Sequence, residues 1–315
     1  MTLALGAHVG QQNMSADEMR ALWRKLDAGG ADWISAWDHI YEAPPAGGTI
    51  DHFEAVATLG ALAAETTNAR LGCLVFYVGY RNAGLLAKIA TTLDHLSGGR
   101  FTLGIGAGWH EVEAAAYGYD FPSLGARLDM LEESVQLIRG LLTQERTTFE
   151  GEHVSVQDAS CLPLPVQDRL PIWIGGVGEK RTLRMVAKYA DGWNAAYVSP
   201  AEYRRLGGVL DQWCDTEDRD PSEVERSINV MFHLASDEAG LRQEEERIDA
   251  EWGPMAERVR QGALLSTPEQ AVERILEYRE AGADMLNVAL RMPVVPEALD
   301  AYLEVVMPAV RAEVS

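Results

Sequence analysis

The stretch PIWIGGVG at residues 171–178 shows the pattern on which the chain is built. A short apolar run, typical of a buried strand, passes into a glycine-rich turn, and residues 179–189 then follow with helical periodicity. A strand, a tight turn and a helix in this order form one βα unit of a parallel sheet. The remaining sequence repeats this unit on both sides.

Outward from this stretch, strands alternate with helices along the chain. Strands are expected at 3–9, 33–37, 71–77, 101–105, 172–174, 192–195, 227–234 and 285–290. Helices are expected at 15–29, 53–65, 84–96, 124–142, 179–189, 200–218, 266–281 and 297–312. Eight such units in 315 residues favour a closed (β/α)8 TIM barrel over an open doubly wound sheet, since the barrel needs ~250 residues plus insertions. We expect a single domain, 1–315, with an inserted hairpin near 146–157 and an acidic helical segment near 237–261.

Composition narrows the possible partners. A net charge of −21 and a pI near 4.7 repel nucleic acid and anionic lipid, so neither is an expected partner. Cys73, Cys161 and Cys214 are far apart, which fits a reducing cytoplasm better than a disulfide framework. The sequence has neither a signal-like start nor an apolar run of ~20 residues, so we expect a cytoplasmic protein that does not enter the membrane.

The turn formed by Gly175, Gly176, Val177 and Gly178 is a candidate phosphate site. It opens a helix, where unpaired amides and the positive end of the helix dipole favour an anion. Lys180 and Arg181 fall in the expected first helical turn, where a cation opposes the dipole unless an anion is near. The alternative is a tight βα turn that only needs glycines. The turn lacks the GxxxxGK[ST] pattern of a triphosphate P-loop.

A second glycine cluster, Gly106-Ala107-Gly108, follows the strand at 101–105. It superficially resembles a dinucleotide fingerprint but lacks the third glycine at the required spacing, so a Rossmann fold remains only an alternative. In a barrel, these glycines would let a flat ring approach the backbone, with Trp109 as one wall of the pocket.

His39 directly follows the strand at 33–37 and could present its imidazole at the barrel mouth as a proton donor or acceptor. The alternative is an ordinary polar loop residue. Asp38 is not automatically its orienting partner, because neighbouring strand residues point in opposite directions. We expect no catalytic metal and no serine hydrolase, since the sequence has no HExxH motif, carboxylate cluster or GxSxG motif.

Several segments together resemble the luciferase-like monooxygenase superfamily, and its F420-dependent branch more than its FMN-dependent one. They are YRN at 80–82, LAK at 86–88, TLDHLSGGRF at 92–101, LGIGAGW at 103–109, PIWIGGVG at 171–178 and ADGWN at 190–194. The resemblance implies a (β/α)8 barrel, often dimeric, and therefore a homodimer. It implies coenzyme F420, with FMN as the alternative, and places Asp38 and His39 on the substrate side of the deazaflavin. It also implies that Leu74 and Val75 back the ring with a bulge that often contains a cis peptide.

The chain departs from the sugar-phosphate dehydrogenases of this family at two points. Trp109 replaces the acid that follows their GxG, and Ala195-Ala196-Tyr197 replaces the segment that carries their lysine. We therefore expect a small, neutral organic substrate in a pocket lined by aromatic side chains, although each of these could equally be barrel packing. They are Trp37, Tyr77, Trp109, Trp193 and Tyr197.

The expected activity is hydride transfer between the deazaflavin and a carbonyl, imine, alkene or alcohol carbon, with His39 moving the proton. An FMN monooxygenase is the alternative within the fold. A non-catalytic flavin or F420 carrier is the alternative of another class.

Overall fold

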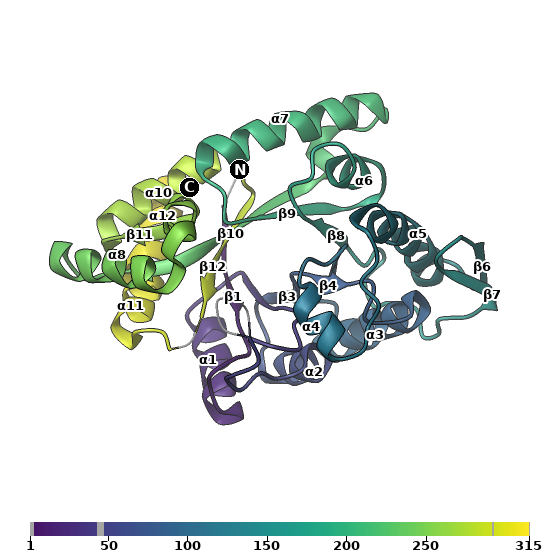
Figure 1. Ribbon diagram of the computed structural model, residues 1–315, viewed down its shortest axis with the longest axis horizontal. Coiled ribbons are helices and arrows are strands. Elements are labelled where there is room, and N and C mark those ends of the chain that lie inside the picture. The colour runs from purple at the N-terminus through teal and green to yellow at the C-terminus, as the bar shows by residue number, and fades with distance from the viewer. Residues whose placement is uncertain (1–2, 43–46, 292, 315) are drawn as a thin grey trace.

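Eight parallel strands close into a barrel within the residues that this computed structural model describes, 3–42, 47–291 and 293–314 (Figure 1). In spatial order they are β1 (Ala4–Val9), β2 (Trp33–Ala36), β3 (Arg70–Cys73), β5 (Phe101–Gly106), β8 (Ile172–Gly175), β9 (Gly192–Ala196), β10 (Glu225–Leu234) and β12 (Met285–Leu290). Parallel pairing of β12 with both β10 and β1 closes the ring. The TIM barrel expected from the sequence is confirmed.

Helices surround this barrel (Figure 1). They are α1 (Ala16–Ala28), α2 (Ala55–Glu65), α3 (Ala83–Ser97), α5 (Leu124–Thr143), α6 (Thr182–Tyr189), α7 (Pro200–Thr216) and α10 (Pro268–Glu280), followed by α11 (Pro296–Ala301), a π-helical turn (Tyr302–Val306) and α12 (Met307–Val314). Local sequence sets their ends. At α1, Ser15 and Glu18 form a reciprocal capping box, and Gly29 ends the helix. Across the described ranges no helix is long and apolar enough to cross a bilayer.

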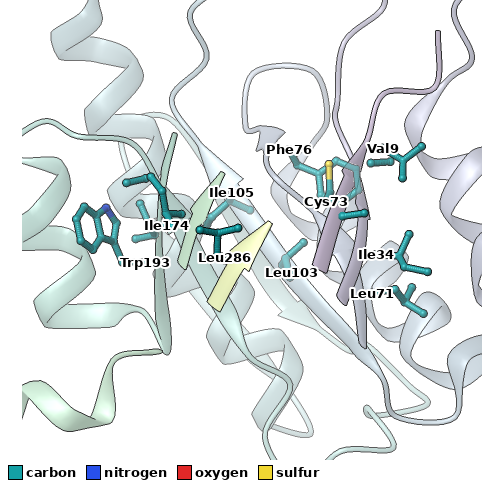
Figure 2. Close-up of a cluster of buried hydrophobic side chains, with 14 of the residues drawn as sticks. Val9, Ile34, Leu71, Cys73, Phe76, Leu103, Ile105, Ile174, Trp193 and Leu286 are labelled. Atoms are coloured by element: carbon teal, nitrogen blue, oxygen red, sulfur yellow. The ribbon is translucent and has the colours of Figure 1, made fainter. Parts of the chain in front are cut away.

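Alternation along the strands separates two layers of side chains. Val9, Ile34, Leu71, Leu103 and Ile174 belong to one buried apolar cluster, which Figure 2 shows beside the strands. That cluster also contains the buried faces of the helices, so it forms the core between barrel and helix ring.

The alternate strand residues face the barrel interior, where many are polar. Asn194, Ser227, Asn229 and Asn287 join in hydrogen bonds across three strands. Below the mouth, Trp33 and Trp173 stack with ring centroids 5.1 Å apart and fill the barrel. The upper interior is therefore polar and lies beneath the loops that follow the strands.

Two further segments complete the fold. β6 (Thr147–Glu150) and β7 (Ser155–Ala159) form an antiparallel hairpin beside α5, and α8 (Glu238–Trp252) and α9 (Ala256–Gln261) form the acidic segment (Figure 1). Short 3-10 turns lie at Pro221–Glu223 and Gly253–Met255.

The strand expected at 71–77 forms two strands, β3 and β4 (Phe76–Tyr77), and the cis peptide that the family resemblance implied lies between them at Leu74–Val75. In the described residues β4 pairs with β5. Two further elements were not expected. The strand β11 (Ala263–Ser266) extends the sheet beside the end of β10. A short helix, α4 (Glu111–Ala116), lies just after β5.

Candidate functional site at the barrel mouth

The loop that follows β2 places His39 at the carboxyl-end rim of the barrel. Its Nδ1 lies 2.7 Å from the Oε1 of Glu113 on α4, a carboxylate that is 2% exposed. The His39 side chain keeps 15% of its surface exposed. Nδ1 is thus engaged by Glu113, and among the described residues no hydrogen bond occupies Nε2, which leaves that nitrogen for a ligand.

Aromatic rings enclose the imidazole. The Trp109 ring meets it edge-on at 5.3 Å, the His110 ring at 5.8 Å, and the Trp37 ring at 6.4 Å. Trp37 is buried and donates its indole N–H to His52, whereas Trp109 is 61% exposed. The structure therefore brings Trp37 and Trp109 together around His39, and contact of either ring with a substrate stays a prediction.

Asp38 has a different task from His39. Its carboxylate accepts hydrogen bonds from Arg81 at 2.7 Å and from the amide of Tyr77 at 3.0 Å, and its side chain is 3% exposed. Burial raises the pKa of Asp38 against the opposing influence of Arg81. Asp38 therefore ties the β2 loop to β4 and does not orient His39.

The cis peptide places the Val75 side chain between two glycines. A Cβ at Gly106 would lie 2.6 Å from Val75 Cγ2, and one at Gly175 would lie 2.7 Å from Val75 Cγ1. A Cβ at Gly108 would meet the Tyr77 ring at 2.5 Å. These glycines thus leave room for the Val75 and Tyr77 side chains, and the close approach of a ring to Gly106 and Gly108 stays a prediction.

The turn after β8 retains free amides. The Gly176 amide donates to the Asn194 carbonyl, but in the described part of the chain no hydrogen bond uses the amides of Val177 or Gly178. Gly176 has a φ of +132°, and a Cβ at Gly178 would lie 2.7 Å from the hydroxyl oxygen of Thr182, the first residue of α6. Two amides and one hydroxyl at a helix start fit a phosphoryl group.

The basic residues beside this turn require a correction. Lys180 and Arg181 precede α6 and do not lie in its first turn. Arg181 donates to Asp129 of α5 at 2.6 Å, so its charge has an intramolecular partner. The assignment of a candidate phosphate site therefore rests on the free amides of Val177 and Gly178 and not on Arg181.

Trp193 is expected from the sequence to line the substrate pocket, and the structure contradicts this. It is fully buried, stacks on Tyr203 of α7 at 5.1 Å, and donates its indole N–H to the Gly176 carbonyl. Strand alternation explains the difference, because Asn194 takes the inward position on β9.

The side chains of Tyr77 and Tyr197 also pack against other residues of the protein. The Tyr77 ring is 5% exposed and packs against Tyr80 and Phe121, with its hydroxyl buried and unpartnered among the described residues. Tyr197 has a φ of +58° and packs on the cluster beneath α8. A ligand role for either residue stays a prediction.

Sequence patterns did not reveal several residues of the site. Glu113 stands four positions after Trp109, on a helix too short to show a period. His8, whose ring centroid lies 5.2 Å from that of Trp37, is a single polar residue inside an apolar strand. His52 and His110 come from loops. No cluster of three or more possible metal ligands occurs in residues 3–42, 47–291 and 293–314.

Comparison with known proteins identifies the family. Residues 1–255 match the model of the luciferase-like monooxygenase family, and the chain belongs to it. An uncharacterised Mycobacterium tuberculosis protein is 37% identical over 136 residues, which are 43% of this chain and 47% of that protein. The chain thus matches about half the length of that relative.

Two further proteins match over more of the chain. An F420-dependent glucose-6-phosphate dehydrogenase from Microbacterium testaceum is 28% identical over 283 residues, covering 80% of this chain and 81% of that protein. An F420-dependent secondary alcohol dehydrogenase, solved with an F420-acetone adduct, superposes with a TM-score of 0.87 at 20% identity and covers 98% and 99% of the two chains. The latter likeness shows the fold.

Proposed function

We propose that this protein is an F420-dependent oxidoreductase that acts on a small, neutral organic substrate. The reaction is hydride transfer between the deazaflavin and a carbonyl, imine, alkene or alcohol carbon. The dehydrogenase similar over 80% of the chain supports the cofactor assignment. The family resemblance further predicts a homodimer, which light scattering would test.

One observation carries the proposal: His39 and the β8 turn share a rim. His39 follows β2, the free amides of Val177 and Gly178 follow β8, and both strands run parallel in one closed sheet. The imidazole keeps Nε2 for a reacting group, while the turn offers amides to an anion. A cofactor with a phosphate and a redox-active ring needs both features at one end of the barrel.

In this proposal, residues of the chain hold the cofactor, orient its ring and transfer the proton. The amides of Val177 and Gly178, with the Thr182 hydroxyl, would hold the phosphate, and Val75 would support the ring from the barrel side. The deazaflavin, when bound, supplies or accepts a hydride at C5. His39 takes up or releases the accompanying proton at Nε2. General acid–base catalysis of this kind raises the rate about 10²–10⁴-fold.

The surroundings of His39 favour an uncharged substrate. Trp37 and Trp109 present rings, and the exposed Trp109 stands where the sugar-phosphate enzymes carry an acid. Rings of this kind bind apolar organic groups and provide no charge for a phosphate. A small alcohol, ketone or imine fits these residues better than a sugar phosphate.

The test compares His39→Ala with His153→Ala, the same change in the hairpin and away from the rim. Purified proteins are titrated with F420 by fluorescence and then assayed against a panel of alcohols, ketones, imines and alkenes. We expect His39→Ala to bind F420 like the parent and to lose about 10²-fold or more in kcat. His153→Ala should match the parent. An unchanged kcat in His39→Ala would remove His39 from the mechanism.

The same assay separates the alternatives. An FMN monooxygenase would consume oxygen with reduced FMN in proportion to product, whereas deazaflavin does not readily activate oxygen. A carrier would bind F420 and turn over no substrate in the panel. The outcome expected here, without oxygen uptake, is bleaching of oxidised F420 by an alcohol, or oxidation of reduced F420 by a ketone, imine or alkene.

A further inference from the structure

Glu113 is a buried carboxylate surrounded by hydrogen-bond donors. Its Oε1 lies 2.7 Å from Nδ1 of His39 and accepts from the Tyr80 hydroxyl at 2.8 Å. Its Oε2 accepts from the amides of Ile40 and Tyr41 at 3.0 and 3.2 Å. These bonds fix both oxygens from two directions, so that the carboxylate cannot turn away from the imidazole.

This environment keeps Glu113 ionised. Burial opposes ionisation, but the hydrogen bond and charge of His39 and the two loop amides outweigh it and lower the pKa of Glu113 to about 2. An ionised carboxylate only accepts hydrogen bonds. The hydrogen between the two groups must therefore belong to Nδ1 of His39, and in the neutral imidazole Nε2 must then carry a lone pair.

The other titratable rings near His39 are held neutral. Burial, with a smaller contribution from the charge of His39, lowers the pKa of His8 to about 3. Burial lowers the pKa of His52 to about 4 and also lowers that of His110. None of the three rings therefore competes with His39 as the charged partner of Glu113 near neutral pH.

The nearby carboxylates are occupied elsewhere. Asp38 pairs with Arg81, and Glu42 accepts from the amides of Gly48 and Thr49. In the described ranges the one ion pair of Glu113 is with His39. Among the described residues, Glu113 is thus the carboxylate that contacts the imidazole and fixes its direction.

We propose that Glu113 is a positioning residue that fixes His39 with its proton on Nδ1 and its Nε2 directed to the reacting group. This inference rests on the proposed function for its catalytic consequence. In alcohol oxidation, Nε2 would take the proton as the substrate O–H bond breaks, the O–H electron pair would form the carbonyl, and the C–H bond would break with its hydride passing to the oxidised cofactor. The reverse steps reduce a ketone. Without Glu113, half or more of the imidazole would present N–H, and not a lone pair, to an alcohol.

The first test uses the parent protein without cofactor. Nitrogen-15 NMR of histidine-labelled protein assigns the His39 tautomer above the pH at which the ring loses its charge. The signal is identified by its loss in His39→Ala. We expect the Nδ1–H form. The Nε2–H form, or an equal mixture of both, would overturn the inference whether or not any Glu113 variant folds.

The second test compares Glu113→Gln with Glu111→Gln, an exposed residue on the same helix. The amide introduced by Glu113→Gln can donate to Nδ1, so the tautomer should change. With F420 and a substrate, kcat should fall on the order of 100-fold. The dissociation constant of F420 should not change. Glu111→Gln should match the parent throughout.

The two proposals fail in different ways. A Glu113→Gln protein that keeps the parent tautomer contradicts the positioning role even if F420 is the cofactor. Glu113→Asp, which keeps the charge, should restore much of the Nδ1–H signal, and a signal like that of Glu113→Gln would count against the charge argument. A parent protein that binds no F420 contradicts the proposed function and leaves the tautomer result standing.

Discussion

Gly176→Ala tests whether the backbone of the β8 turn matters as argued. The φ of +132° at Gly176 is one that residues with a Cβ rarely adopt, and the added Cβ would lie 3.2 Å from Thr182 Cγ2. Such strain costs about 1–3 kcal/mol. The variant has two possible outcomes. Either the backbone keeps its conformation and the protein is less stable by this amount, or the turn relaxes and the amides of Val177 and Gly178 move.

If the turn relaxes, F420 affinity should fall. A hydrogen bond to a charged group is worth about 1.5–3 kcal/mol, so losing one amide weakens binding roughly 10- to 100-fold. Gly208→Ala on α7 is the control, because a Cβ there meets nothing within 4 Å and the change should stabilise the helix by about 0.5–1 kcal/mol. Urea unfolding and F420 titration measure both effects. A Gly176→Ala protein with parental stability and affinity would refute the reasoning.

Three further predictions concern other parts of the site. Trp193→Ala should lower the free energy of unfolding by about 3–5 kcal/mol, whereas the exposed Trp109→Ala should change KM with little effect on urea unfolding; the opposite pattern would contradict the assignment of these two residues. Asp38→Ala should cost about 3–5 kcal/mol because it leaves Arg81 without its buried partner, while Glu54→Gln, at the exposed side of the same arginine, should cost no more than about 1 kcal/mol; equal costs in urea unfolding would contradict this. Burial lowers the pKa of His8 from 6.5 to about 3, so between these pH values the unfolded chain binds a proton that the folded chain excludes. The free energy of unfolding should therefore fall as the pH drops through that range. Unfolding curves of His8→Asn should show a shallower fall.

The sequence predicted the barrel because its signals are local and repeated. The capping box at Ser15 and Glu18, the strand at 285–290 and the hairpin around Gly151 follow from residue spacing alone. The break in the strand at 71–77 was expected only through family resemblance, since no feature of Leu74 or Val75 distinguishes a cis peptide.

The site was predicted less completely, because its partners are distant in sequence. His39 was found from its place after a strand, but Glu113 lies 74 positions away and is joined to it only by the fold. The pocket position predicted for Trp193 was wrong because the sequence does not show which face of the short strand β9 points into the barrel. The hydrogen bonds of Asn194 show that its side chain, and not that of Trp193, points inward. Residue spacing along the chain predicted which loops form the rim of the barrel. Contacts between residues distant in sequence determine which side chains meet there.

The most direct measurement is a fluorescence titration of the purified protein with F420 and, separately, with FMN. F420 should bind saturably and more tightly than FMN, and addition of an accepted alcohol should then bleach the bound cofactor in the parent but not in His39→Ala. Saturable binding of FMN with none of F420, or no binding of either, would contradict the assignment of a deazaflavin beside His39.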